Sequence, residues 1–320
     1  MRIESKTISG NRKQVSVVLL SHNRPAYLAE ALQSLANQSY RDIQITVVDN
    51  PSPASAQIEA IVKDFSGVKL IRNDRNVGYT GGMNRGLKQA DGPFVLLTED
   101  DIVLKADCIE NLVKYFEQNG SSDLVAPIIY DKQGSKIRIA GGHFELSSVY
   151  RMTIYGEGEY DTGQFPKPFE VNYVSGAALF ARAEFWEELE GFRDDFFMYV
   201  DELELCARVV KSGKKISVVP QAKVYHFEPA ADPTAPEIEF HKIKNFFSLY
   251  LLHAPKRVLP EFLCRYAVLN TVRTMLGRTG SSPRTFIKAL LWVTARTPSL
   301  LMERYRNGDA YGEIKVNHEL

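Results

Sequence analysis

The sequence predicts an α/β fold in which helices flank a mostly parallel, mixed sheet, followed by a helical C-terminal extension. The first observation is that short apolar runs rich in β-branched residues alternate with amphipathic patterns over the first hundred residues, which is typical of parallel strand–helix–strand units. The second is that three of these runs end in polar residues. Ligands of such sheets bind beyond the carboxyl ends of the strands, so these residues predict a site at one edge.

Each element is placed by its own pattern. Continuous apolar runs predict buried strands, and apolar residues recurring every three or four positions predict helices. The strands are expected at residues 15–20, 43–48, 68–71, 94–97 and 216–219. The helices are expected around residues 27–35, 58–65, 81–90, 184–189 and 200–211. Pro220 should close the last strand, Gly213 should cap the last helix, and the Gly- and Tyr-rich residues 130–172 should form irregular or hairpin structure.

The patterns divide the chain into four regions. They are a polar tail at 1–14, the α/β domain at 15–228, a linker rich in Ala, Asp and Pro at 229–240, and a basic helical extension at 241–320. Helical stripes in the extension are expected around residues 243–250, 259–266 and 286–291. Although the chain has a net charge of +0, residues 241–306 hold twelve Lys and Arg and only two acids. This asymmetry indicates a basic surface that faces an anionic partner.

Composition limits the class of protein. Charged residues make up 24% and hydrophobic residues 44% of the 320 residues, as in ordinary soluble proteins. Cys108, Cys206 and Cys264 are far apart and form no C-x-x-C pair, so we expect a reducing compartment. The first residues lack the apolar core of a signal peptide, and no run approaches the roughly 18 apolar residues that a membrane span needs. We therefore expect a cytoplasmic protein.

Glu99, Asp100 and Asp101 form the sharpest chemical feature. They follow directly on the apolar run 94–97, and adjacent carboxylates raise one another's pKa unless a cation or strong donors compensate. A hard divalent ion shared with substrate phosphates fits this arrangement. A solvated turn, or an N-cap formed by Asp101, is the alternative. The position of the cluster at the predicted ligand edge favours the metal.

Three other features have both a structural and a functional interpretation. Residues 76–86 (NVGYTGGMNRG) are dense in glycine, which permits close approach to a ligand or makes a flexible loop. They are not the dinucleotide fingerprint, which follows the first strand. Asp201 and Glu202 suit the first turn of a helix, or a general base beside an apolar wall. A lone histidine such as His226 is more often structural, but gains weight as a ligand beside an acidic metal site.

Taken together, these segments resemble the family 2 glycosyltransferases with the GT-A fold, which is Rossmann-like. The likeness covers roughly Val15 to Glu228 and looks closest to the branch of bacterial rhamnosyltransferases and galactofuranosyltransferases. Four pieces carry it in the family's order: VSVVLLSHNRP with ITVVDNPS; NVGYTGGMNRG; LLTEDDIVL; and GFRDDFFMYVDELELCARVVKSGKKISVVPQAKVYH. Each piece alone is a weak indication of the family, but the four pieces in this order are highly specific for it.

The resemblance implies roles for individual residues. Those that match the donor nucleotide-sugar site are Ser21, Asn23, Asp49, Asn76, Gly78, Asn84, Arg85 and Asp100. Glu99 and Asp101 match the two acids of the D-x-D motif. Asp101 would bind Mn²⁺ or Mg²⁺, and Glu99 would contact the ribose or the metal. His226 matches a histidine that can complete the metal shell.

The resemblance also places the catalytic base in the pair Asp201–Glu202. Many relatives carry Glu and then Asp at these two positions, whereas this chain has Asp and then Glu. Alignment favours Glu202 as the base, with Asp201 in reserve. One base that deprotonates the acceptor hydroxyl, opposite the leaving group, gives in-line displacement and inversion at the sugar carbon.

The implied reaction moves a sugar from a nucleotide diphosphate sugar, carrying UDP or dTDP, to a glycan or polyprenyl-linked acceptor in bacterial surface polysaccharide synthesis. The stretch 130–172 would shape the acceptor side. The extension either packs on the catalytic domain or rests on an anionic membrane surface at the inner face of the cytoplasmic membrane. Nucleic acid is a weaker partner because no recognition motif accompanies the charge. A homo-oligomer stays open.

Two other functions are weighed. A nucleotidyltransferase would share the α/β layer and the metal acids, but usually has a glycine-rich phosphate loop after the first strand, and here that strand runs into Ser21-His22-Asn23 instead. A catalytically silent sugar-nucleotide-binding or scaffold protein is kept open by the reversed order of Asp201 and Glu202. Chelator-sensitive hydrolysis of a nucleotide sugar by the purified protein would exclude the silent alternative.

Overall fold

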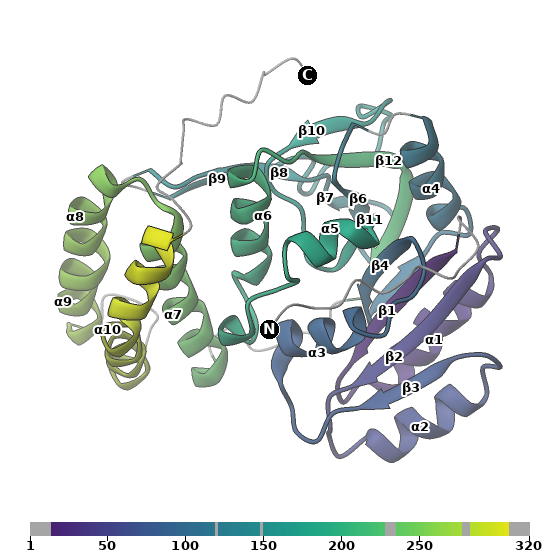
Figure 1. Ribbon diagram of the computed structural model, residues 1–320, viewed down its shortest axis with the longest axis horizontal. Helices are drawn as coiled ribbons and strands as arrows, with labels where there is room; N and C mark the ends of the chain where they lie inside the picture. Colours follow the sequence, from purple (N-terminus) through teal and green to yellow (C-terminus); the bar gives the residue numbers. More distant parts are fainter. Residues whose placement is uncertain (1–13, 119–120, 148–149, 228–234, 277–281, 307–320) are drawn as a thin grey trace.

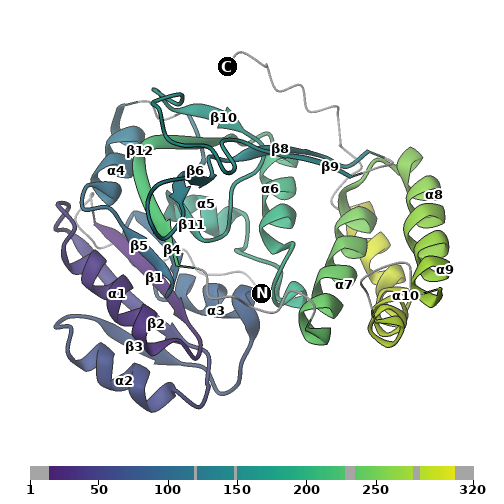
Figure 2. The ribbon, with the colours of Figure 1, turned by 180° about the vertical axis from the view of Figure 1, so that it is seen from behind.

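The computed structural model describes residues 14–118, 121–147, 150–227, 235–276 and 282–306. Figure 1 shows an α/β domain beside a bundle of C-terminal helices, and Figure 2 shows the same arrangement from behind. The predicted fold class is confirmed, because a mixed sheet is flanked by helices and followed by a helical region. The predicted tail, except residue 14, and the last residues of the extension lie outside the described residues.

A mixed sheet forms the centre of the α/β domain. The strands on its main path are β1 (Val15–Ser21), β2 (Ile43–Asp49), β3 (Lys69–Arg72), β4 (Phe94–Glu99), β6 (Leu124–Tyr130), β10 (Phe169–Val171), β11 (Ala178–Arg182) and β12 (Ile216–His226). Their order is β10-β12-β6-β11-β4-β1-β2-β3, with β5 (Ile102–Leu104) paired to β12 and β7 (Ile137–Ile139) paired to β6. β1, β2, β3 and β4 run parallel, whereas β11 is antiparallel to both of its neighbours.

The register of the parallel strands brings the polar clusters together. Ser21 at the end of β1 pairs with Asp49 at the end of β2, and Leu20 pairs with Glu99 at the end of β4. The carboxyl ends of three strands therefore meet at one edge. This confirms that the polar residues after the three apolar runs share the place where sheets of this kind bind ligands.

Helices cover both faces of the sheet and bury two apolar layers. On one face lie α1 (Pro25–Ala36), α2 (Ser55–Lys63) and α4 (Cys108–Gln118). On the other lie α3 (Gly78–Leu87), α5 (Ala183–Glu188) and α6 (Asp201–Lys211). The second layer continues into the C-terminal helices without a break, so the extension shares a core with the domain.

The glycine-rich segment is helical, which corrects the expected helix start. The sequence predicts a helix from residue 81, but α3 begins at Gly78. The glycines serve close packing on the sheet: a Cβ on Gly82 would lie 2.4 Å from Leu20 Cδ1, and one on Gly86 would lie 2.1 Å from Val18 Cγ1. Glycines at these two positions let α3 lie directly against β1.

β12 continues past Pro220, where the sequence predicts its end. The register with β6 shifts between Val219 and Lys223, so a bulge absorbs the proline, which cannot donate to the ladder. Beyond the bulge the strand runs on to His226, which pairs with Ile102 on β5. The predicted cap of α6 is confirmed: Gly213 has φ +75°, and the amides of Gly213 and Lys214 bond to Val210 and Val209, which is a Schellman motif.

The stretch 130–172 contains the expected hairpin, made of β8 (Gly142–Glu145) and β9 (Arg151–Ile154). The hairpin reaches towards the C-terminal helices in both ribbon views (Figures 1 and 2). Two contacts confirm this: the Tyr250 hydroxyl donates to the Ser147 carbonyl at 3.1 Å, and the Tyr150 ring packs edge-on against Phe246. The region expected to shape the acceptor side therefore touches the extension.

The C-terminal helices begin inside the expected linker, so the predicted boundary at 240 is wrong by about one helical turn. α7 starts at Pro236, where a proline in the first turn loses no hydrogen bond. Residues 228–234 lie outside the described residues. The helical elements are α7 (Pro236–His253), α8 (Leu259–Phe262), a π-helical segment (Leu263–Leu269), α9 (Asn270–Met275) and α10 (Pro283–Arg306). No helix among the described residues is long and apolar enough to cross a membrane.

Candidate active site

The three acids lie in the tight turn between β4 and β5. Asp100 and Asp101 are 0% and 2% exposed, and Glu99 keeps about a quarter of its side chain in solvent. The Asp100 amide bonds to the Leu20 carbonyl at 3.0 Å, and the His22 amide donates to Asp100 Oδ2 at 3.0 Å. The turn is thus bound to the end of β1.

Arg24 is the cation that compensates these acids. Its guanidinium lies 2.7 Å from Asp100 Oδ1, 2.5 Å from Asp101 Oδ2 and 3.9 Å from Glu99 Oε2. The arginine sits at the N-cap of α1, directly after β1. No pattern in the sequence pointed to a role for this residue. The alternation of strand and helix carries no sign that a residue before α1 would reach the turn after β4.

The acids differ in their affinity for protons. Burial, followed by the charge of Asp101, raises the pKa of Glu99 to about 7. Burial raises the pKa of Asp100 to about 6, against the charge of Arg24. Burial also acts to raise the pKa of Asp101, but the hydrogen bond with His226 and the charge of Arg24 outweigh it and leave that pKa lowered. Asp101 is therefore the acid most firmly ionised at neutral pH.

Asp101 and His226 meet as the sequence predicts for two metal ligands. His226 Nε2 lies 3.5 Å from Asp101 Oδ2, because β12 pairs with β5 beside the turn. Asp101 Oδ1 is buried and has no hydrogen-bond partner. No group of three or more His, Cys, Asp or Glu side chains suited to a metal occurs in the described part of the chain. The arrangement fits an ion held by two protein groups and by substrate phosphates, as Mg²⁺ often is.

Asp201 and Glu202 open α6 and face the same site. Asp201 is 5% exposed and Glu202 is half-buried. Burial and the charge of Glu202 raise the pKa of Asp201 well above its ordinary value, and Glu99 adds to this rise. Burial also raises the pKa of Glu202, whose Oε1 accepts a hydrogen bond of 3.4 Å from the Tyr173 hydroxyl. The fold therefore brings residues 99 and 201 into electrostatic contact.

The end of β2 forms a second polar corner. Asp49 is fully buried, pairs with Arg72 Nε at 2.8 Å, and has a second oxygen without a hydrogen-bond partner. Asn50 donates to the Gly78 carbonyl at 2.9 Å and accepts from the Asn73 side chain at 2.8 Å. Asn50 joins the ends of β2 and β3 to the start of α3, and its place beside Asp49 was the only signal of this role.

The other predicted donor residues fall into two groups. Asn84 is engaged within the protein: its amide donates to the Phe192 carbonyl and to Asp194 Oδ1, each at 2.7 Å. Asn76 Oδ1 accepts from the Gly78 amide at 2.8 Å and so shapes the start of α3. Ser21 is buried at the end of β1 and Asn23 is exposed just after it, whereas Arg85 is exposed in the last turn of α3, away from the start of that helix. Their ligand contacts remain a prediction.

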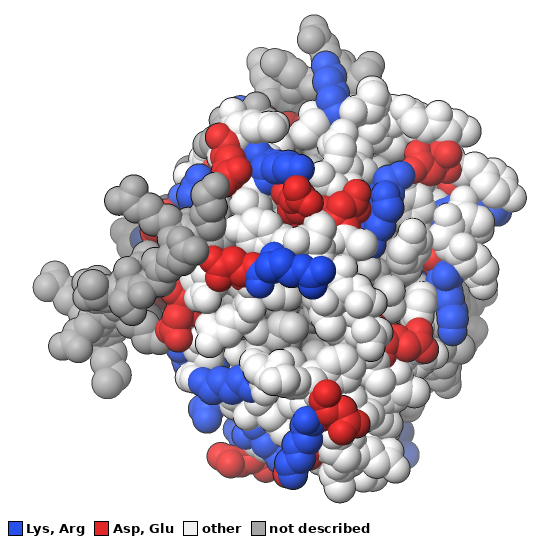
Figure 3. Space-filling model, turned by 90° about the vertical axis from the view of Figure 1, so that its right-hand side faces the viewer, with Lys and Arg blue, Asp and Glu red and all other residues white. Residues whose placement is uncertain are grey.

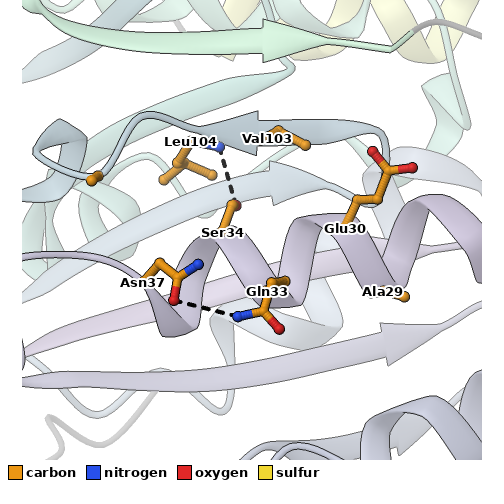
Figure 4. A pocket seen from close by; sticks show the side chains of 8 residues that line it. Ala29, Glu30, Gln33, Ser34, Asn37, Val103 and Leu104 are labelled. Atoms are coloured by element: carbon orange, nitrogen blue, oxygen red, sulfur yellow. Dashed lines mark hydrogen bonds between the residues drawn. The ribbon is translucent and has the colours of Figure 1, made fainter.

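A separate hollow of about 560 Å³ lies between α1 and β5. In Figure 4 the Ser34 side chain of α1 points towards Leu104 of β5, whereas Gln33 lies beside Asn37, the residue that follows α1. Ser34 Oγ accepts from the Leu104 amide at 3.1 Å, and Gln33 bonds to Asn37. Its polar groups bond to one another, and neither the acids of the β4–β5 turn nor those of α6 line it. We assign it no part in the chemistry.

Comparison with known proteins shows the family to which the chain belongs. A family model described as glycosyl transferase family 2 matches residues 16–188, more than half of the chain. Two relatives are a glycosyltransferase of Haemophilus influenzae described as uncharacterized, and an N-acetylglucosaminyl-diphospho-decaprenol L-rhamnosyltransferase of Mycobacterium tuberculosis. The first is 22% identical over 62% of this chain and 61% of its own length. The second is 24% identical over 72% of this chain and 82% of its own length.

A solved structure supports the fold. The crystal structure of GalNAc-T7 with UDP, GalNAc and Mn²⁺ superposes with a TM-score of 0.61 and 15% identity, over 90% of this chain and 58% of that one. With the strand order described above, this confirms the predicted GT-A fold. The chain spans less than two thirds of GalNAc-T7 and of the Haemophilus relative.

Proposed function

This chain belongs to glycosyl transferase family 2, and we propose that it moves a sugar from a nucleotide diphosphate sugar to a hydroxyl of a glycan or lipid-linked acceptor. The proposed reaction inverts the sugar carbon, depends on Mn²⁺ or Mg²⁺, uses a UDP- or dTDP-sugar, and belongs to bacterial surface polysaccharide synthesis at the cytoplasmic side of the membrane. The name of the mycobacterial rhamnosyltransferase supports a lipid-linked acceptor.

The convergence of Glu99 with Asp201 is the observation that carries the proposal. A transferase needs an anionic corner for the donor diphosphate and its counter-ion, and a base beside it for the acceptor. Burial and the charge of Glu202 are the larger causes of the raised pKa of Asp201, and the charge of Glu99 adds to it although the two residues are about a hundred positions apart. Acids meeting from two elements, each with a perturbed pKa, are typical of an active site.

The residues of this chain would divide the work as follows. Asp101 and His226 would hold the metal, with Glu99 beside them at the ribose or the metal. The bound ion would neutralise charge that builds on the leaving diphosphate. Glu202 would take the proton from the acceptor hydroxyl as that hydroxyl attacks, and Asp201 stands in reserve. A base whose pKa is raised towards the working pH suits this transfer.

The extension supplies a surface suited to a lipid-linked acceptor. Exposed apolar side chains gather on its last helices; they are Val268, Leu269, Val272, Met275, Leu276, Leu291, Met302 and Tyr305. Residues 241–306 carry twelve Lys and Arg against two acids, and of these Lys244 and Arg304 are buried and do not contribute to the surface. On the face of the molecule away from the extension, basic and acidic side chains alternate (Figure 3). Apolar groups with a basic excess favour an anionic membrane surface.

Thermal stabilisation is the first test of the donor site. Melting would be measured with UDP, dTDP and their sugars, with and without Mn²⁺, on the wild type and Asp101→Ala. A ligand that binds the folded state raises its stability with affinity and concentration. We expect one nucleotide to shift the melt only with metal, and Asp101→Ala to lose that shift. No shift with any nucleotide would contradict the donor site and favour a silent scaffold.

Turnover and membrane binding need their own measurements. Nucleotide-sugar hydrolysis that is abolished by a chelator would exclude the silent alternative. For the membrane, sedimentation with vesicles of zwitterionic lipid alone and with added phosphatidylglycerol would be compared, using the wild type and Leu269→Ser/Val272→Ser. We expect binding to the anionic vesicles only, weakened in the variant. Equal binding to both vesicles, or none, would contradict the proposed surface.

A further inference from the structure

The segment before α6 has an unusual backbone. Phe197, Tyr199 and Val200 have φ of +66°, +63° and +62°, the left-handed region that side chains other than glycine rarely adopt. Val200 is β-branched, for which this region is least favourable. The segment leads directly into Asp201 and Glu202, so its conformation decides where the two acids point. A conformation of this kind persists only when its surroundings impose it.

Asn245 on α7 imposes much of this conformation. Its side-chain amide donates to the carbonyls of Phe196, Met198 and Tyr199 at 2.8, 2.9 and 2.7 Å. The asparagine is 0% exposed. One buried side-chain amide therefore satisfies three carbonyl groups of an irregular segment of backbone.

Lys244 and His241, on the same face of α7 as Asn245, also contact the segment before α6. Lys244 Nζ donates to the Asp195 carbonyl at 2.6 Å and to Asn245 Oδ1 at 2.6 Å, which orients the asparagine amide towards the segment. The His241 ring stacks on Phe197 with 4.6 Å between ring centres. Residues three and four apart lie on one side of a helix, so the three side chains form a single contact surface.

The opposite side of the segment rests on α3. The Phe197 carbonyl accepts from the Thr80 amide at 3.1 Å. A Cβ on Gly78 would lie 2.3 Å from that carbonyl oxygen, so only glycine fits there. The segment is therefore held between the C-terminal extension and the helix at the predicted donor side.

We propose that Lys244 and Asn245 are positioning residues for the transfer reaction. Through them the extension fixes the strained segment 195–200 and so orients the two acids Asp201 and Glu202, one of which is the proposed catalytic base, towards the donor. Only the expected effect of these residues on turnover rests on the proposed function. The extension is then part of the active-site architecture, whatever else it binds. A base displaced by about 1 Å can cost on the order of 100-fold in rate.

Kinetics give the first test. Asn245→Ala removes the donors, and Asn245→Asp keeps the shape but turns an acceptor towards three carbonyl oxygens. We expect kcat to fall about 10- to 100-fold in both, more in Asn245→Asp, with the donor KM within about threefold of the wild type. The matched control is Arg304→Met. Arg304 is buried and donates to the Leu251 and Ala254 carbonyls at the far end of α7.

The control separates positioning from stability. We expect Arg304→Met to lower the melting temperature as Asn245→Ala does, while its kcat stays within about twofold of the wild type. If both variants lose activity in proportion to stability, or if Asn245→Ala keeps its kcat, the positioning role is wrong. A wild type with no turnover would instead contradict the proposed function.

Hydrogen exchange tests the same inference without turnover. We expect Asn245→Ala to speed exchange of the amides of residues 196–204 and of Thr80, which bonds to Phe197, while β1 and β2 keep their wild-type protection. Arg304→Met should leave residues 196–204 protected. Unchanged exchange of that segment in Asn245→Ala would overturn the inference, whether or not the enzyme is active.

Discussion

Arg24 Nη1 and Asp101 Oδ2 lie 2.5 Å apart, so a guanidinium contacts the carboxylate that the family resemblance assigns to a metal. The same arginine pairs with Asp100 at 2.7 Å. The chain thus carries its own counter-ion for the acids of the β4–β5 turn. A metal ion and Arg24 would compete for the Asp101 carboxylate, and the outcome can be measured.

The first prediction concerns this competition. Arg24→Ala leaves Asp100 and Asp101 buried without their counter-charge, so we expect the metal-free protein to lose about 1–3 kcal/mol of unfolding free energy. Mn²⁺ should then raise the melting temperature of Arg24→Ala more than that of the wild type. Arg24→Lys, which keeps the charge, should fall between the two. An equal Mn²⁺ shift in all three proteins would show that Arg24 and the metal do not compete.

The fold could be predicted from the sequence because its signals are local and repeated. The apolar runs at 15–20, 43–48 and 94–97 each fix a strand, and parallel pairing follows from the helices between them. Placement of Ser21, Asp49 and Glu99 at one edge then follows from register. Pro220 misled the prediction because a bulge, which depends on the neighbouring strand β6, absorbs it.

The site was only partly predictable, because much of it depends on contacts between distant elements. Glu99, Asp101 and His226 could be found by resemblance, but Arg24 pairs across 77 positions with Asp101. In the sequence, Asn245 is one polar position in an amphipathic helix, and only the fold reveals its three carbonyl partners. The glycines of residues 78–86 suggested a ligand loop, yet Gly82 and Gly86 are explained by the approach of α3 to β1.

The second prediction tests that packing. Gly86→Ala would place a Cβ 2.1 Å from Val18 Cγ1 and 3.1 Å from Val48 Cγ2. Alanine gains about 1 kcal/mol in helix propensity, but overpacking a rigid core costs about 1–3 kcal/mol or more, so we expect a net loss of unfolding free energy. Urea denaturation measures it. Arg85→Ala on the exposed side of the same helix should change stability by less than about 0.5 kcal/mol, and a Gly86→Ala as stable as Arg85→Ala would refute the packing argument.

The third prediction is a pH dependence of stability from Glu204. Burial acts to raise its pKa, but the charge of Arg208 and the hydrogen bond with His253 hold that pKa at about 2. A carboxyl with a lowered pKa stabilises the folded state above its unfolded pKa of about 4.3, and this contribution is lost as pH falls towards 2. Glu204→Gln leaves Arg208 partly uncompensated, so we expect it to lose roughly 3 kcal/mol at pH 7.

The pH profile distinguishes this cause from simple loss of packing. The difference in unfolding free energy between wild type and Glu204→Gln should be constant between pH 7 and 5 and shrink below about pH 4.5. Glu261→Gln is the control, because the Glu261–Arg265 pair is exposed and such pairs contribute little. A difference that stays constant below pH 4.5 would show that the ionised carboxylate is not the source.

The fourth prediction assigns the base. Burial, followed by the charge of Glu202, raises the pKa of Asp201 well above its ordinary value, which disfavours the ionised form that a base needs. The pKa of Glu202 is also raised by burial, but its half-buried side chain can reach an acceptor. We expect Glu202→Gln to lower kcat about 10²- to 10⁴-fold with nucleotide affinity unchanged, and Asp201→Asn to lower kcat less than about tenfold.

The pH–rate profile provides the deciding measurement for this pair. In the wild type, the acidic limb of kcat/KM should lie above the ordinary glutamate value of about 4.3, because burial disfavours the ionised form of Glu202. Asp201→Asn removes a neighbouring acid, so any movement of that limb should be towards lower pH. If Asp201→Asn abolishes turnover while Glu202→Gln retains it, the base is Asp201. The base would then be the first acid of α6, and not the second acid that alignment favours.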